Sequence, residues 1–139
     1  AFTSAGKDNY IREENIDLLI NTTGLPKRYF QFILRPAPDS GMDAAMNIAL
    51  RGADPREDIL DRSWDSDWTY AFQLLPGQNT WTAEVRIPLK DLGGFQVKPG
   101  KSITMNVGRV HKNKLFLWSP NPEKAQFGNT MYFGNLVFE

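Results

Sequence analysis

Short segments in which apolar and polar residues alternate set the fold class of this chain. In the stretch WTAEVRIPLKDLGG, residues 81–94, apolar side chains fall at every second position of the first seven. These residues are Trp81, Ala83, Val85 and Ile87. An extended chain places such residues on one face, which predicts a half-buried strand. Pro88 then ends the strand because it has no N–H for a sheet ladder, and the Gly93-Gly94 pair permits a chain reversal.

Similar segments recur along the chain, separated by Pro, Gly, Asn and Asp residues that favour turns. The predicted strands are residues 15–21, 28–35, 44–50, 68–75, 81–87, 102–110, 114–118 and 131–138. Short strands with turn signals between them are typical of a β-sandwich or barrel. A chain of 139 residues is long enough for one domain with one core and too short for two. We therefore predict an all-β, antiparallel β-sandwich of jelly-roll type over residues 1–139.

The segment DPREDILDRSWDSDW, residues 54–68, interrupts this strand pattern. Asp54 can cap a helix that begins at Pro55, with Glu57 reaching back to the cap. The segment therefore predicts a short helical excursion near residues 54–63, between two strands.

The same segment is rich in carboxylates, which are ligands that Ca²⁺ prefers. Asp54, Asp65 and Asp67 are the candidate ligands of a structural calcium site. Arg56 and Arg62 lie among the acids and offer ion pairs instead. The alternative interpretation is a solvated loop that binds no metal.

The charge balance bears on possible partners. Sixteen Lys and Arg residues match sixteen Asp and Glu residues, so the net charge is zero. Nucleic acid and anionic membranes attract basic proteins, and neither is expected as a partner here. No apolar run approaches the length of a membrane span. The chain has no cysteine, which excludes disulfide and thiol chemistry and leaves the compartment open.

No constellation of catalytic residues is apparent in the sequence. The patterns GxSxG and HExxH are both absent. His111 is the only histidine and lies in the lysine-rich stretch His111-Lys112-Asn113-Lys114, which predicts an exposed turn residue. Any two of sixteen acids could be nominated as a glycosidase pair, so the nomination carries no weight. We predict that the domain is not an enzyme.

Five segments, in chain order, carry a resemblance to a known family. They are EENIDLLI, YFQFILRPAPDSGMDAAM, WTAEVRIPLKDLG, PGKSITMNVGRV, and LFLWSPNPEKAQFG with the closing YFGNLVFE. Together they resemble the family 9 carbohydrate-binding modules, which are β-sandwich domains attached to secreted glycan-active enzymes. The resemblance covers the chain from about residue 13 to the end. It implies a non-catalytic accessory module that binds oligo- or polysaccharide and is secreted, periplasmic or displayed at the cell surface.

The chain also departs from the family pattern. Family members carry a few strands ahead of the acidic opening EENIDLLI, and only about twelve residues precede it here. The resemblance therefore implies a module that lacks its N-terminal strands and belongs to a longer polypeptide. Because an open sheet edge exposes unpaired backbone groups, we expect a neighbouring segment or another chain to complete the sheet.

The resemblance also implies which aromatic residues bind sugar. In the family, two aromatic rings sandwich a terminal sugar, because the C–H face of a pyranose packs on an aromatic face. Trp118 matches the second of these rings. Tyr10 is the nearest aromatic residue to the first, and Trp64 competes with it because it lies off any strand period. For Trp118 the alternative is a structural corner residue.

Polar residues are expected to read the sugar hydroxyls. Arg109, Asn113 and Asn121 flank the segment that contains Trp118. Asp17 lies on the acidic strand, where the family has a carboxylate that can contact sugar hydroxyls. For each of the four, the alternative is an ordinary surface group.

Two other functions remain open from the sequence. One is a purely structural sandwich that supports a neighbouring catalytic domain and binds no sugar, because the family's first stacking Trp is missing. The other is a haem-binding electron-transfer sandwich, which needs two axial ligands facing one cavity. Its candidate ligands are His111, Met46, Met105 and Met131, although Met105 alternates with apolar neighbours and fits the core.

Overall fold

The protein is all β. The computed structural model describes residues 14–36, 41–46, 60–75, 77–78, 80–122 and 128–139. Its strands are β1 (Asn15–Asn21), β2 (Tyr29–Leu34), β3 (Met42–Met46), β4 (Leu60–Asp61), β5 (Thr69–Leu75), β6 (Thr80–Arg86), β7 (Ser102–His111), β8 (Lys114–Leu117) and β9 (Gly134–Val137). Two 3₁₀ turns, η3 (Leu89–Asp91) and η4 (Thr130–Tyr132), lie between strands. Within the described ranges, no helix has the length and apolar character needed to cross a membrane.

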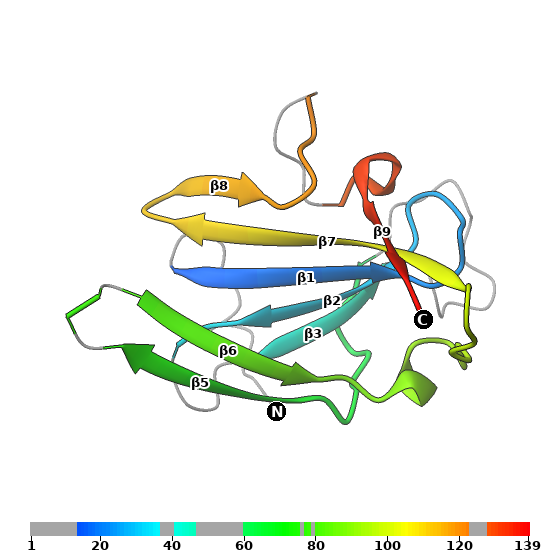
Figure 1. The fold of residues 1–139 in the computed structure, drawn as a ribbon, viewed down its shortest axis with the longest axis horizontal. Coiled ribbons are helices and arrows are strands. Elements are labelled where there is room, and N and C mark those ends of the chain that lie inside the picture. The colour runs from blue at the N-terminus through cyan, green and yellow to red at the C-terminus, as the bar shows by residue number, and fades with distance from the viewer. Residues whose placement is uncertain (1–13, 37–40, 47–59, 76, 79, 123–127) are drawn as a thin grey trace.

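The strands form two antiparallel sheets (Figure 1). The large sheet has the order β4-β3-β2-β1-β7, and both β8 and β9 pair with β7. β8 pairs with residues 108–111 and β9 with residues 102–105, so they follow one another along the same strand. The small sheet consists of β5 and β6. The prediction of an antiparallel β-sandwich is confirmed.

The core lies between the two sheets. Strand β2 contributes Phe30 and Phe32, which are almost completely buried and lie in register with Ile20 and Leu18 of β1. From the other side, Trp68 and Ile87 at the ends of the small sheet pack on this cluster. Burying each large apolar side chain contributes about 1.5–3 kcal/mol to folding, so this cluster is the main source of stability.

The opposite face of the large sheet buries polar side chains. Asp17 of β1 is buried and accepts two hydrogen bonds from the Gln31 amide, at 3.1 and 2.9 Å. Burial away from water disfavours the ionised carboxylate, and it raises the pKa of Asp17 to about 7. Asn106 of β7 is also buried; its amide nitrogen donates to the Ser119 backbone oxygen, and its amide oxygen accepts from the Ser119 N–H. This face therefore holds its polar groups in internal hydrogen bonds.

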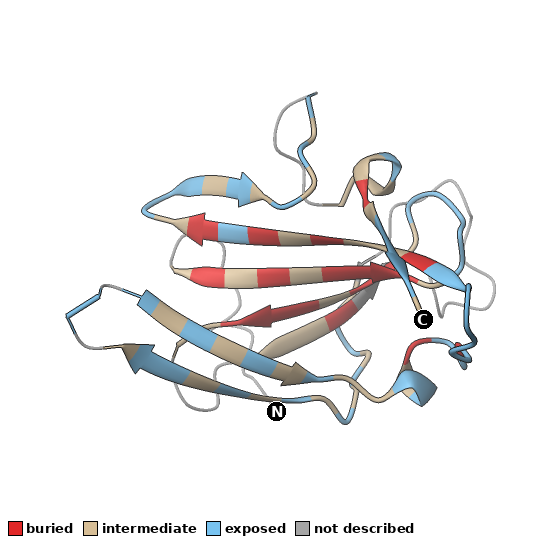
Figure 2. Cartoon of the chain, viewed as in Figure 1, coloured by how far each residue is buried: buried red, intermediate tan, exposed pale blue. Residues whose placement is uncertain are grey.

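The small sheet covers only part of the large one. Figure 2 shows buried residues concentrated on β1, β2 and β7, whereas β5, β6 and β8 carry intermediate and exposed residues. Phe116 of β8, Trp118 just after it and Leu136 of β9 are 52%, 59% and 41% exposed. The register places Phe116 opposite Arg109, and Leu136 opposite Ile103 of the core cluster. These apolar groups therefore lie on the core-side face of the large sheet, beyond the edge of the small sheet.

Most strand predictions agree with the structure to within one or two residues. Residues 47–50 of the predicted strand 44–50 lie outside the described residues. The stop and turn after β6 are confirmed, because Gly93 and Gly94 have φ values of 71° and 70° that favour glycine. The segment 131–138 is corrected: its first residues belong to η4, since the Asn129 side chain accepts a hydrogen bond from the Met131 N–H. The strand β9 begins only at Gly134.

The predicted helical excursion near residues 54–63 is also corrected in part. Residues 54–59 lie outside the described residues. Leu60 and Asp61 are extended and pair with β3 as strand β4. The chain then bends because Asp61 Oδ1 accepts hydrogen bonds from the backbone N–H and hydroxyl of Ser63. A side chain that bonds the backbone two residues ahead favours a turn over a helix.

Candidate functional site

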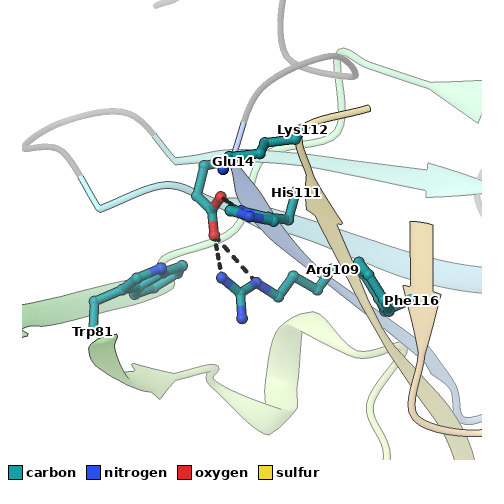
Figure 3. A pocket seen from close by; sticks show the side chains of 6 residues that line it. All are labelled: Glu14, Trp81, Arg109, His111, Lys112 and Phe116. Atoms are coloured by element: carbon teal, nitrogen blue, oxygen red, sulfur yellow. Dashed lines mark hydrogen bonds and ion pairs between the residues drawn. The ribbon is translucent and has the colours of Figure 1, made fainter. Parts of the chain in front are cut away.

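A pocket of about 820 Å³ lies between the two layers, where β6 begins and β7 ends. Its lining comes from β6, from Glu14 just before β1, and from the hairpin of β7 and β8. The lining residues are Glu14, Trp81, Arg109, His111, Lys112 and Phe116 (Figure 3). Two aromatic rings and four ionisable side chains thus surround one cavity of a size suited to a small ligand.

The β7–β8 hairpin positions most of this lining. Lys112 and Asn113 form a two-residue turn with φ values of 48° and 62°, and His111 pairs with Lys114 across it. Positive φ at both central residues is the pattern of a type I′ turn, which matches the twist of a hairpin. Asn tolerates this conformation well, so Asn113 has a backbone reason to be Asn. The tight turn places Arg109, His111 and Phe116 on one face, with Lys112 at the rim.

Glu14 holds the charged groups of the pocket together. Its Oε1 accepts hydrogen bonds from both Nε and Nη2 of Arg109, the first at 3.1 Å. Its Oε2 contacts Nδ1 of His111, so a proton on that ring nitrogen would complete the bond. Partial burial raises the pKa of Glu14, but the bonds from His111 and Arg109 outweigh it and lower the pKa overall. Glu14 is therefore a carboxylate whose two oxygens are both engaged.

Aromatic rings lie on both sides of this charged cluster. In Figure 3, Trp81 of β6 and Phe116 of β8 stand on opposite sides of the side chains of Glu14 and Arg109. Trp81 is only half-buried and Phe116 is exposed, so part of each ring is open to a ligand. Rings beside hydrogen-bonding groups are the combination that a sugar requires.

Trp118 extends the aromatic surface beyond the pocket. It continues β8 with the spacing of Phe116, and its backbone N–H donates to the Val107 oxygen at 2.8 Å. Its ring lies so close to Gly134 of β9 that a Cβ added to that glycine would come within 2.5 Å of Cζ3. The ring thus rests against a glycine backbone while 59% of the residue stays exposed. Trp118 is a fixed, accessible aromatic group, and it does not line the pocket itself.

The structure brings some of the predicted sugar-binding residues together and separates others. Arg109 lines the pocket, and Trp118 lies on the same sheet face. Asn113 belongs to the hairpin turn, and Asn121 is a half-buried residue beyond Trp118; neither lines the pocket. Asp17 lies on the opposite face of the large sheet and is buried.

Of the two remaining aromatic candidates, Tyr10 and Trp64, only Trp64 lies among the described residues. Trp64 packs against Phe30 and Phe32, with ring-centroid distances of 5.0 and 5.8 Å. The Trp64 ring thus covers one side of the core, although it belongs to a segment without strand periodicity. It does not line the pocket.

Only some of the residues proposed as metal or haem ligands lie among the described residues. Asp54 and the Met46 side chain are outside the described part, and Asp65 is exposed. Asp67 pairs with Lys90 at 2.7 Å, which lowers the pKa of Asp67. Within the described ranges, no group of three or more His, Cys, Asp or Glu side chains could hold a metal ion.

The three remaining haem candidates do not face one cavity. His111 contacts Glu14 in the pocket. Met105 packs against the core cluster, and Met131 is 80% exposed. These placements offer no pair of axial ligands among the described side chains.

Sequence reasoning missed several pocket residues. The alternation of β6 predicted Trp81 as a core residue, and it does face inward, but it lies where the layers leave a cavity. His111 was expected in an exposed turn and is instead the last residue of β7, bonded to Glu14. No pattern in the sequence predicted that Phe116 or Glu14 would line a pocket. Alternation along the strand could have identified Phe116. Residues two positions apart on an extended segment share one face, so Phe116 lies on the same face as the predicted binding residue Trp118.

Comparisons with known proteins bear on the fold. Neither a protein-family model nor a curated protein matches the sequence. A crystal structure of a "putative carbohydrate-binding protein" from Bacteroides uniformis ATCC 8492 superposes with a TM-score of 0.62 at 16% sequence identity. The match covers 94% of this chain and 63% of that chain, so this chain spans less than two thirds of the neighbour. At this identity the likeness shows a shared fold, and that fold is the all-β sandwich described above.

Proposed function

We propose that this domain is a non-catalytic carbohydrate-binding module, similar to the family 9 modules, that binds a sugar in the pocket lined by Trp81, Arg109 and Phe116. One observation carries the proposal: partly exposed aromatic rings and hydrogen-bonding groups held by Glu14 line the same cavity. The Bacteroides uniformis neighbour, described as a "putative carbohydrate-binding protein", supports the same class of ligand.

The chemistry of the pocket supports the proposal step by step. A pyranose ring stacks its C–H face on Trp81, on the side where Glu14 and Arg109 lie, and Phe116 adds apolar surface beyond Arg109. Arg109 is held by Glu14, so it meets the sugar hydroxyls without first losing side-chain freedom. Trp118, on the same sheet face, is a second platform for a longer oligosaccharide.

The setting of the module is part of the proposal. We infer an accessory role in a secreted, periplasmic or cell-surface protein that acts on glycans, where a glycoside hydrolase is the expected catalytic neighbour. Tethering a binder to an enzyme raises the effective concentration of substrate near the catalytic site. A structural calcium in the segment around Asp65 and Asp67 remains a separate proposal, which titration with Ca²⁺ would test.

Titration calorimetry with a panel of mono- and oligosaccharides tests the proposed function. The wild type is compared with Trp81→Ala and Trp118→Ala. The matched control is Leu89→Ala, which truncates an exposed apolar residue in η3, past the end of β6 that lies away from Trp81. We expect micromolar-to-millimolar binding that Trp81→Ala weakens about tenfold or more, Trp118→Ala weakens for oligosaccharides, and Leu89→Ala leaves unchanged. Absence of binding across the panel, with an intact fold by circular dichroism, would reject the proposal.

A different observation favours a second candidate, a sandwich that is completed by a neighbouring strand. Among the described strands, β6 has a pairing partner only in β5, while Phe116, Trp118 and Leu136 lie uncovered on the core-side face beyond it. We propose that an extended strand from a neighbouring segment or chain pairs with β6 and covers them. If the strand comes from another chain, Trp118→Ala lowers the mass measured by light scattering, whereas the loss of a sugar platform lowers only the affinity for the ligand. A monomer at all concentrations with a fully paired sheet would rule the strand out.

A further inference from the structure

We propose that the pocket selects acidic sugars, with the ring of a uronic acid on Trp81 and its carboxylate bound by Arg109 and Lys112. This inference rests on the proposed function and deepens it by naming the class of sugar. It starts from the charges that line the cavity. Arg109 and Lys112 are two cations and Glu14 is one anion, so the lining carries one net positive charge while His111 is neutral and two when it is protonated.

The hydrogen-bonding capacity left in the pocket consists mainly of donors. Both oxygens of Glu14 are engaged, one by Arg109 and the other by His111. Arg109 uses Nε and Nη2 in this contact. Its Nη1 and the Lys112 ammonium make no hydrogen bond or ion pair with the described residues, and the Arg109 side chain is 48% exposed. A pocket that offers donors and little free acceptor capacity favours a ligand rich in acceptors.

A carboxylate fits this arrangement better than a neutral hydroxyl. Hydrogen bonds between a guanidinium or ammonium group and a carboxylate are about twice as strong as those between neutral groups. The Glu14 contact also holds the guanidinium plane in place, and an oriented guanidinium suits a planar carboxylate. In a uronic acid the carboxylate is attached to the ring that stacks, so one ligand meets both Trp81 and the cations.

The experiment is titration calorimetry of the whole chain with two matched pairs of sugars at about pH 7, in roughly 50 and 300 mM salt. The pairs are glucuronate with glucose and galacturonate with galactose, and sodium acetate shows how much the carboxylate contributes alone. We expect at least one uronate to bind about tenfold tighter than its neutral partner, and this preference to shrink in the higher salt.

Two charge-removing variants locate the effect. Lys112→Asn keeps a residue that tolerates positive φ, so the hairpin turn is preserved. Lys98→Asn removes the same charge ahead of Ser102, at the opposite end of β7 from the pocket. We expect Lys112→Asn to reduce the preference for the uronate about threefold or more and Lys98→Asn to leave it unchanged.

The outcomes separate this inference from the function on which it rests. Neutral sugars that bind as tightly as the uronates, with Trp81→Ala weakening both, would overturn the charge preference and leave the proposed function standing. Binding of no sugar of either kind would overturn the proposed function and this inference with it. An equal loss in Lys112→Asn and Lys98→Asn would show that general charge attraction, and not the pocket, recognises the ligand.

Discussion

Two nearby carboxylates, Glu14 just before β1 and Asp17 within it, meet opposite environments on the two faces of one sheet. Asp17 is buried, its partner is the neutral amide of Gln31, and its pKa rises to about 7. Glu14 stands in an open pocket against Arg109 and His111, and its pKa falls. Residues three positions apart on an extended chain point to opposite faces of the sheet, so the two carboxylates differ in solvent exposure and in their partners.

This contrast shows which polar group is available for binding. The bonds of Asp17 are internal, so it serves the packing of the sheet and contributes no free contact to a ligand. Glu14 is also hydrogen-bonded, but its partners Arg109 and His111 are half-exposed and can make further hydrogen bonds to a ligand. The face on which Asp17 is buried is therefore structural at that position, and the face that the small sheet leaves partly open carries the candidate site.

The strongest effect we expect is the pH dependence of stability from Asp17. Its folded pKa lies above its ordinary value of 3.8, so the stabilising contribution is complete below that value and is lost as the pH rises through about 7. The loss amounts to about 4 kcal/mol, because each tenfold change in proton affinity between the unfolded and folded states corresponds to about 1.4 kcal/mol. Urea unfolding at several pH values measures it, with Asp17→Asn as the control that removes the dependence. A wild-type stability that stays flat between about pH 4 and 8 would contradict this assignment.

Gly134→Ala is expected to have the next largest effect. A Cβ there would come within 2.5 Å of the Trp118 ring, so the ring has to move. We expect a destabilisation of about 1–3 kcal/mol in the free energy of unfolding, with a shift in tryptophan emission. The control is Asn135→Ser, the neighbouring position on the same strand, which we expect to leave both readouts nearly unchanged. An unchanged stability together with an unchanged tryptophan emission for Gly134→Ala would mean that Trp118 does not lie against β9.

Trp81→Ala tests the contrast between the two faces. We expect it to lower sugar affinity about tenfold or more, which is about 1.4 kcal/mol or more, because the ligand loses both the aromatic contact and its packing on the ring. Asp17→Asn, at the buried face, is expected to leave the affinity unchanged at about pH 6, where the Asp17 carboxyl is mostly protonated and neutral. Calorimetry on both variants measures the contrast, and a loss of affinity in Asp17→Asn alone would reverse the assignment of the faces.

Glu14→Gln is expected to have the weakest effect on stability. The ion pair with Arg109 lies partly in solvent, with 48% of the Arg109 side chain exposed, and exposed pairs contribute about 0–1 kcal/mol. Because the folded pKa of Glu14 is lowered, any contribution is present above its ordinary value of 4.5 and disappears as the pH falls. Sugar affinity should still fall, since Arg109 loses its anchor. Urea unfolding measures the stability, and a large loss would show that the pocket is part of the core.

The sequence predicted the fold well because alternation and turn signals are local. Strand β6 and its stop at Pro88 appear in the structure as the pattern indicated. The irregular segment around Trp64 was harder, because a loop residue that packs on Phe32 leaves no periodic signal. The all-β class was therefore accessible from the sequence, whereas the part of the core that loops contribute was not.

The site was only partly accessible for a related reason. Arg109 and Trp118 were predicted, but the contact of Arg109 with Glu14 joins residues 95 positions apart. That contact depends on β1 pairing with β7, which no local spacing reveals. Trp81 has an inward position that alternation predicts correctly, yet whether an inward residue is core or pocket depends on where the second layer ends.

Sugar binding on the open face is tested most directly with the four tryptophans as internal reporters. Nitrogen–proton NMR spectra record one indole signal for each, assigned with single Trp→Phe variants, during titration with the oligosaccharide that binds best. We predict that the signals of Trp81 and Trp118 shift with ligand, while those of Trp64 and Trp68 in the core stay in place. Shifts confined to Trp64 or Trp68, or no shift at saturating sugar, would contradict the assignment of the site to the open face.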